Sequence, residues 1–281
     1  MAHQIVVDVD QLAALHHLGT PTAVYKPSTI LAIFGGLVVI FFGAAWAVIA
    51  FYITSAVGSS FSSTGFPTIL ALVFPLFGLM FLLIGVVLIV KAFLNYTLSV
   101  QVYQYGLVFH KRNSNDVIRW DQIAFVWHKV KKTTTTTHNT NPSTGYNTTT
   151  TSTSTYHTYI VQRVDGANFV FDRTFSRLRE LGGTIEQEAA RYLLPQAIAA
   201  YNAGHPIMFG KMSVSFSGVS DGRKMLSWSE LKSIKVDENN GAIAIRKQGK
   251  WLNWSNISLS ETPNILVFET LVNSIVGSRP W

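Results

Sequence analysis

The chain contains no cysteine and few charged residues, and both shortages restrict the kind of protein it can be. Without cysteine it can hold no disulfide framework, no thiolate zinc site and no iron–sulfur cluster, and it has no cysteine nucleophile. Charged residues make up only 13% of the 281 residues, against roughly 25% in an ordinary soluble domain. Not one of them lies between Lys26 and Lys91. This composition argues against a purely soluble protein, and against disorder over most of the chain, because disorder accompanies low hydrophobicity and high net charge.

Several nucleotide-binding and metalloprotease motifs are also missing. The sequence has no G-x-x-x-x-G-K-[ST], no G-x-G-x-x-G and no H-E-x-x-H. His128, His138 and His157 are irregularly spaced around a threonine-rich tract and have no neighbouring carboxylate, so we do not interpret them as a zinc site. We therefore predict no catalytic residue, no cofactor and no metal, and we expect a protein that is not an enzyme.

Two long apolar runs fill the uncharged region, at about residues 28–55 and 67–94. A membrane hydrocarbon core about 30 Å thick is crossed by ~20 helical residues, so each run is long enough to span it. The polar segment Gly58–Gly65 between the runs predicts a short loop. The first run is too long for a cleaved signal peptide. The sequence thus predicts a transmembrane helical hairpin at residues 28–95, preceded by an N-terminal segment at residues 1–27.

The few basic residues beside these runs predict an orientation. Lys26 precedes the first run, Lys91 ends the second, and the connecting segment has neither Lys nor Arg. Positive charge favours the cytoplasmic side, so we expect both termini there, in a multi-pass protein of the cell membrane. Small residues share one face of the first helix, at Ala32, Gly36, Gly43 and Ala47. We expect this face to pack the two helices together, with a seam between two copies of the chain as the alternative.

The remainder of the chain alternates in the manner of short β-strands, and its order of elements occurs twice. Trp120-Asp121-Gln122-Ile123 matches Trp228-Ser229-Glu230-Leu231. We predict strands before and after each tryptophan, a helix at the end of each unit, and a structural role for both rings. The helix of the first unit is expected over residues 175–201, with a break at Gly182-Gly183. Asp165-Gly166 predicts a hairpin turn just before it.

A tract in the first unit, residues 133–155, is more than half threonine. It cannot form a core, so we interpret it as an insertion that makes a solvated loop or a flexible hairpin tip. Threonine also has a high β-strand propensity, which leaves a ragged two-stranded extension as the other option.

Antiparallel strands followed by one C-terminal helix resemble the pleckstrin-homology-like (PH-like) fold. The whole layout is similar to a family of bacterial two-span membrane proteins of unknown function. The resemblance rests on Gly106-Leu107-Val108, Trp120-Asp121-Gln122-Ile123, Leu193-Leu194-Pro195, Phe209-Gly210, Leu226-Ser227-Trp228 and Pro263-Asn264. It implies a membrane α-helical hairpin plus an α+β cytoplasmic region made of two PH-like antiparallel barrels or sandwiches, each closed by a C-terminal helix. The two domains would occupy residues 96–204 and 205–281.

Positive charge is the remaining indication of a partner. The candidate binding residues form two groups: Lys129, Lys131 and Lys132, and Arg246, Lys247 and Lys250. Each Lys or Arg near an anionic leaflet gains about 1 kcal/mol. No nucleic-acid motif accompanies the charge, so nucleic acid is not an expected partner. Trp251 and Trp254 lie three positions apart on a predicted strand, so one should be in the core and the other exposed.

We therefore expect a non-enzymatic, membrane-anchored tandem PH-like module. It would bind a protein partner or anionic lipid headgroups at the inner membrane surface. The alternative is a structural subunit that forms homo-oligomers through its transmembrane helices and binds no ligand.

Overall fold

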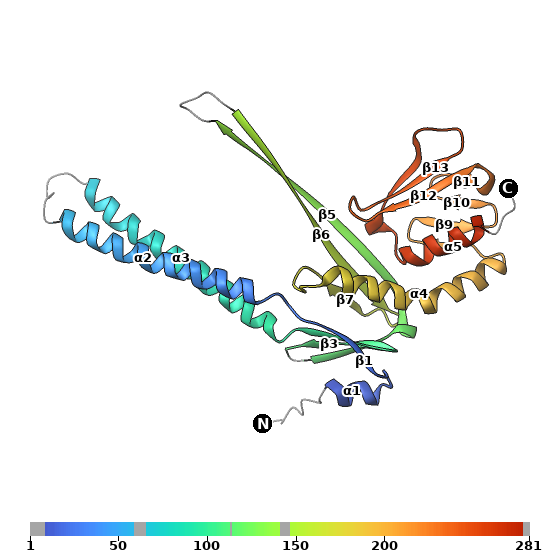
Figure 1. Ribbon diagram of the computed structural model, residues 1–281, viewed down its shortest axis with the longest axis horizontal. Helices are drawn as coiled ribbons and strands as arrows, with labels where there is room; N and C mark the ends of the chain where they lie inside the picture. The colour runs from blue at the N-terminus through green and yellow to red at the C-terminus, as the bar shows by residue number, and fades with distance from the viewer. Residues whose placement is uncertain (1–8, 59–65, 113, 141–146, 278–281) are drawn as a thin grey trace. The chain divides into compact units, whose positions relative to one another are not determined.

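The computed structural model of the protein describes residues 9–58, 66–112, 114–140 and 147–277 (Figure 1). The chain divides into two compact units. One contains residues 1–25, 101–108 and 117–281, and the other contains residues 26–100 and 109–116.

The second of these units contains the two predicted long helices, α2 (Ile30–Gly58) and α3 (Phe66–Tyr96). They lie side by side. Small residues at the contact allow the two backbones to approach closely. A Cβ atom added at Gly36 would come within 2.7 Å of the Ile89 side chain, and one added at Gly85 would come within 2.5 Å of Ile40. Gly36, Gly43 and Ala47 of the small-residue face therefore pack against α3 of the same chain, as expected, whereas Ala32 is exposed.

The outer surface of this helix pair is apolar and open. The segments Ala32–Ile53 and Pro75–Tyr96 have mean hydropathies of 2.4 and 2.7, and only 11% and 17% of these stretches are buried. The core helix of a soluble protein would be mostly covered by other parts of its fold. The two helices are thus long and apolar enough to span a membrane.

The N-terminal segment contains a short helix and a strand, and the strand was not predicted from the sequence. Helix α1 (Val9–Leu15) is followed by strand β1 (Pro21–Tyr25). A four-stranded sheet follows the order β1-β2-β3-β4, with β2 at Ser99–Tyr103, β3 at Gly106–Lys111 and β4 at Ser114–Arg119. The Gln104 N–H donates to the Thr20 carbonyl at 3.1 Å, and Thr22 Oγ1 donates to the Val102 carbonyl at 3.1 Å. A strand before α2 is therefore bonded to a strand after α3.

A second sheet has the order β5-β6-β7, with β5 at Ile123–Thr140, β6 at Asn147–Arg163 and β7 at Asn168–Phe171. The threonine-rich tract continues β5 and β6 as a two-stranded ribbon, paired from Ile123↔Arg163 to Thr140↔Asn147 (Figure 1). The side chains at 133–139 and 147–155 are exposed. Of the two options for this tract, the two-stranded extension is the one observed, and residues 141–146 lie outside the described part.

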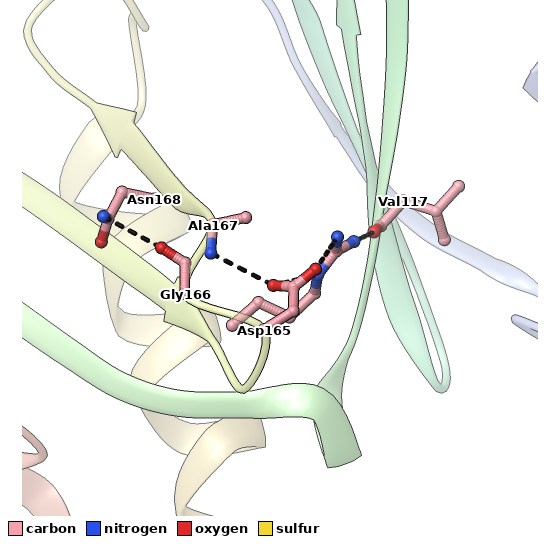
Figure 2. Close-up of polar contacts among 6 residues, drawn as sticks. Val117, Asp165, Gly166, Ala167 and Asn168 are labelled. Atoms are coloured by element: carbon pink, nitrogen blue, oxygen red, sulfur yellow. Dashed lines mark hydrogen bonds and ion pairs between the residues drawn. The ribbon is translucent and has the colours of Figure 1, made fainter.

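The predicted hairpin turn at Asp165-Gly166 joins β6 to β7 (Figure 2). Gly166 has φ +88°, which a residue with a side chain rarely adopts. The Ala167 N–H donates to Asp165 Oδ1 at 3.1 Å, and Asn168 Nδ2 donates to the Gly166 carbonyl at 3.2 Å. Arg163 Nη1 donates to the Val117 carbonyl at 3.0 Å, which ties the turn to β4.

Helix α4 runs from Leu178 to Asn202 without a break. The predicted interruption at Gly182-Gly183 is therefore wrong. A Cβ atom at Gly182 would lie 2.1 Å from Tyr159 Cζ, so this glycine makes room for the ring instead of ending the helix. Thr184 Oγ1 donates to the Glu180 carbonyl at 3.0 Å, a bond within the continuous helix.

The C-terminal half contains two further sheets and a helix. The four-stranded sheet β11-β10-β9-β8 is built from β8 (Ile207–Phe209), β9 (Met212–Ser215), β10 (Gly218–Ser220) and β11 (Met225–Ser227). The three-stranded sheet β12-β13-β14 is built from β12 (Leu231–Asp237), β13 (Ala242–Lys247) and β14 (Asn253–Ser258), and α5 (Ile265–Gly277) ends the chain. One core connects them, with Trp228, Phe268 and Ile245 buried in it.

The expected closed barrels are absent from the described residues. Each tryptophan motif forms a 3-10 turn, Trp120–Gln122 or Trp228–Glu230, at the point where a four-stranded sheet ends and a separate three-stranded sheet begins. The observed architecture is two apolar helices with mixed helix and open antiparallel sheets. Trp120 and Trp228 are buried, as predicted for structural residues, with exposed fractions of 0% and 4%.

Candidate ligand-binding site at the base of the ribbon

Ionisable side chains are buried together where β5, β6 and α4 meet. His128 on β5 is only 1% exposed, and its Nε2 lies 2.9 Å from Nδ1 of His157 on β6. The His128 ring stacks on Tyr159 with 4.3 Å between centroids. Its Nδ1 lies 3.7 Å from Glu186 Oε1 on α4. Both histidines were candidates from the sequence, whereas Glu186 and Tyr159 carry no sequence signal that points to this cluster.

Burial sets the charge of this cluster. It raises the pKa of Glu186 to about 8, and the nearby Glu238 carboxylate adds to this. Burial also lowers the pKa of His128 to about 4, helped by His157 and Arg179. The carboxyl group is therefore mostly protonated at neutral pH, and the imidazole is neutral. Burial raises the pKa of the Tyr159 hydroxyl, so it too stays protonated.

These protonation states indicate which ring nitrogen of each histidine carries the proton. His128 Nδ1 and Glu186 Oε1 have no hydrogen-bond partner in the described part of the chain, and 3.7 Å is too long for a bond between them. A protonated carboxyl group is best placed facing an unprotonated nitrogen. We therefore assign the His128 proton to Nε2, where it is donated to His157 Nδ1. The proton of neutral His157 is then on its other ring nitrogen.

A pocket of about 320 Å³ lies beside this cluster, and we call it the ribbon-base pocket. Its lining residues come from β5, β6 and the segment after β7: Lys131, Thr133, Tyr156, His157, Thr158, Asp172 and Arg173. The pocket exists because β7 ends at Phe171, opposite Tyr159, and leaves the edge of β6 unpaired beyond that point. The Arg173 guanidinium lies 5.5 Å from the centre of the Tyr156 ring. His157 belongs to both the pocket and the buried cluster.

The three lysines of the first predicted basic group have different surroundings. Lys131 lines the ribbon-base pocket. Lys132, on the other face of β5, donates from Nζ to Asn240 Oδ1 at 2.9 Å. Lys129 is exposed, and its side chain makes no hydrogen bond or ion pair with the described residues.

The second predicted basic group is mostly engaged. Arg246 Nε donates to Asn253 Oδ1 at 3.1 Å, and Lys247 forms an ion pair with Glu230. Lys250 is exposed in the turn between β13 and β14 and has no side-chain partner within the described part of the chain. The structure thus does not bring the six predicted residues into one patch.

Lys250 stands instead beside two exposed apolar side chains. Trp251 is 87% exposed and Leu252 is 60% exposed. The Gln248 N–H donates to the Glu230 carbonyl at 2.8 Å, which holds the start of this turn. Trp254, on β14, is partly buried and packs against the core, so the two tryptophans differ in exposure as predicted, although Trp251 precedes the strand and does not share it. We call Lys250–Leu252 the apolar turn.

The third histidine of the tract does not join the site. His138 Nδ1 lies 3.1 Å from Thr149 Oγ1, farther along the ribbon. Among the residues that the structure describes, no group of three or more His, Asp or Glu side chains is arranged to hold a metal ion.

The segment Gly218–Gly222 matches G-x-S-x-G, the motif that carries the nucleophilic serine in many hydrolases, but it lies in a different structural setting. Its serine belongs to β10, which leads into a hairpin turn to β11, whereas a nucleophile elbow joins a strand to a helix. Ser220 Oγ accepts the Gly222 N–H at 3.1 Å. The pattern is therefore explained by the turn.

These features define a protein with two apolar helices, a mixed helix and antiparallel-sheet region, and a small polar pocket at the base of a long ribbon. Residues 1–280 match DUF6585, described as a family of unknown function, and the chain belongs to that family. No curated protein and no solved structure gives a significant match.

Proposed function

We propose that the protein is a non-enzymatic, membrane-anchored module that docks on an anionic lipid surface. Helices α2 and α3 would cross the membrane, with both chain ends on the cytoplasmic side. The sheet supports an even number of crossings, because β1 precedes α2, β2 follows α3, and the two strands are neighbours. Segments bonded in one sheet must lie on the same side of a membrane.

The observation that carries the docking proposal is the apolar turn. Tryptophan is favoured where headgroups meet acyl chains, because its ring is apolar and its N–H is polar. An adjacent leucine adds apolar area, and Lys250 adds the charge that attracts anionic headgroups. Trp251, at 87% exposed, is by far the most open of the described large apolar side chains. An anionic bilayer surface would bury the two apolar side chains and place negative headgroups beside Lys250.

The proposal includes a duplicated PH-like unit of bacterial type in the β-rich region. Its support is the order of elements: a four-stranded sheet, a 3-10 turn at a tryptophan, a three-stranded sheet and a helix occur at β1–α4 and again at β8–α5. The same order would make the threonine-rich ribbon an enlarged hairpin of the first copy.

The absence of cysteine makes the docking testable on the full chain. A Leu252→Cys variant has a single thiol, which can carry an environment-sensitive fluorophore. In nanodiscs of phosphatidylcholine with phosphatidylglycerol, we expect a blue-shifted emission relative to nanodiscs of phosphatidylcholine alone. The matched control is Asn239→Cys, in the exposed turn between β12 and β13, which should not respond.

An emission that is the same in both kinds of nanodisc at position 252 would overturn the docking proposal. A discrete homo-oligomer on cross-linking in native membranes, together with that result, would favour the structural subunit that binds no ligand.

A further inference from the structure

We propose that the ribbon-base pocket binds a phosphate-bearing anion through Lys131 and Arg173. This site is separate from the apolar turn, and it would remain if the docking proposal failed. The inference rests on the charge, the donor groups and the shape of the pocket.

The pocket has an excess of positive charge. Within the described part of the chain, neither Lys131 nor Arg173 forms an ion pair with a carboxylate. The single carboxylate of the lining, Asp172, accepts the Thr174 N–H at 3.0 Å. Two permanent cations against one occupied carboxylate leave a site that favours an anion and disfavours a metal cation.

Arg173 is exposed and is restrained by one ring contact. Its guanidinium lies 5.5 Å from the centre of the Tyr156 ring, and a cation over an aromatic face is stabilised there. The planar guanidinium donates in a fork that matches two phosphate oxygens, so little freedom is lost on binding. Lys131 and Tyr156 are direct cross-strand partners, which brings a second cation to the same face of the ribbon.

The remaining lining residues supply neutral donors. Thr133 and Thr158 carry hydroxyl groups on the same face of the ribbon as Lys131 and Tyr156. Donors that come from both β5 and β6 and from the segment after β7 suit a tetrahedral anion better than a planar carboxylate.

The volume favours a phosphate ester over a large ligand. At about 320 Å³, the pocket is at the lower end of the range for small-molecule sites. The phosphate could belong to a soluble ester or to a lipid headgroup, which share the same chemistry.

The test uses the full chain in phosphatidylcholine nanodiscs and isothermal titration with glycerol 3-phosphate at constant ionic strength. We expect saturable binding, weakened about tenfold or more by Arg173→Gln and by Lys131→Gln, because each removes a charge-assisted contact. The matched control is Lys132→Gln, which removes the same charge from the opposite face of β5 and should bind as the original chain does. Leu252→Ser, in the apolar turn, should also leave this binding unchanged.

A second arm identifies the source of the phosphate. Nanodiscs containing phosphatidic acid should suppress the titration if the lipid headgroup occupies the pocket, and leave it unchanged if the ligand is a soluble ester. Three outcomes would overturn the proposal: no binding of glycerol 3-phosphate at millimolar concentration, full binding in both pocket variants, or an equal loss in Lys132→Gln. Both pocket side chains are exposed, so unchanged thermal unfolding of each variant checks that the fold is intact.

Discussion

Glu186 is the residue whose surroundings most strongly determine its chemistry. Its carboxyl group faces His128 on β5, while Arg179 and Glu238 form an ion pair nearby, with Nη2 and Oε2 3.6 Å apart. Burial holds its pKa near 8 in the folded chain, above the ordinary value of 4.5. A group whose pKa is higher in the folded chain than in the unfolded chain contributes to folding stability, and this contribution is complete at a pH below the unfolded pKa. The contribution is lost as the pH rises through the pKa of the folded chain.

Glu186→Gln should therefore make the chain more stable than the original at alkaline pH. The difference should grow between about pH 4.5 and pH 8 and then level off. It should reach the order of 2–4 kcal/mol, since a tenfold change in proton affinity equals about 1.4 kcal/mol. Thermal unfolding across this range, in nanodiscs, measures it. Glu188→Gln is the control, because Glu188 pairs with the exposed Arg191. A constant difference between pH 5 and pH 9 would contradict the assignment.

His128 contributes in the opposite sense. Its pKa of about 4 lies below the ordinary 6.5, so its contribution is present above pH 6.5 and lost as the pH falls toward 4. The loss on the acid side should persist in Glu186→Gln, which separates the two groups in one experiment.

The neighbouring glycines of α4 should respond in opposite directions to the same substitution. Gly182→Ala forces a Cβ atom to within 2.1 Å of the Tyr159 ring, and should cost about 1–3 kcal/mol by overpacking. Gly183→Ala meets nothing within 4 Å and should stabilise the helix by up to ~1 kcal/mol. Denaturant unfolding of the two variants measures both effects. Equal stability of the two would show that the ring does not pack on Gly182.

The exposure of single residues was only partly predictable from local spacing. Trp251 and Trp254 differ in exposure as predicted, but Trp251 precedes β14, so the two do not occupy opposite faces of one strand. Glu186 carried no such signal, because its burial depends on a helix and a ribbon that meet only in the folded chain. Lys129 and Lys131 share one face of β5 and Lys132 lies on the other, so a run of charge in the sequence is divided between two faces of the ribbon.

Among the elements, the outer part of the ribbon, residues 133–155, is the clearest case of a segment that the fold does not require. Its side chains at 133–139 and 147–155 are exposed, so they contribute no buried core. Joining Thr133 to Ser154, which are direct partners, through Asn-Gly should give a short hairpin with a type I′ turn. We expect the free energy of unfolding to change by less than about 0.5 kcal/mol.

Thermal unfolding of the shortened chain, compared with the original in the same nanodiscs, measures this. A loss of several degrees in melting temperature would mean that the outer ribbon stabilises the fold. Since all seven residues of the ribbon-base pocket remain, glycerol 3-phosphate binding should also be retained.

Elements were predictable where one pattern dominates. The two apolar helices follow from length and composition, and the turn at Asp165-Gly166 follows from a dipeptide that favours it. The break at Gly182-Gly183 failed because tertiary packing overrode the low helix propensity of glycine. Strand β1 was not predicted because its partner β2 lies beyond both long helices. The predicted closed barrels failed at the tryptophan turns, where one sheet ends and another begins.

For the whole molecule, the decisive question is whether lipid surrounds α2 and α3. Their apolar side chains are largely uncovered within the chain, so removal from lipid would expose a large apolar surface to water. After extraction of native membranes with alkaline carbonate, we expect the chain to remain in the pellet. Recovery in the supernatant would contradict the membrane proposal, and a peripheral protein serves as the control for release.

The pairing of β1 with β2 also has a consequence during synthesis. The first strand leaves the ribosome before either long helix, yet its partner is made only after both are complete. Until then, β1 has an unsatisfied edge that nearby nascent segments or a chaperone can occupy. Maturation of the N-terminal sheet is thus delayed by the time that the helical hairpin takes to emerge, and a ribosome stalled within α3 would leave a chain whose first strand has no native neighbour.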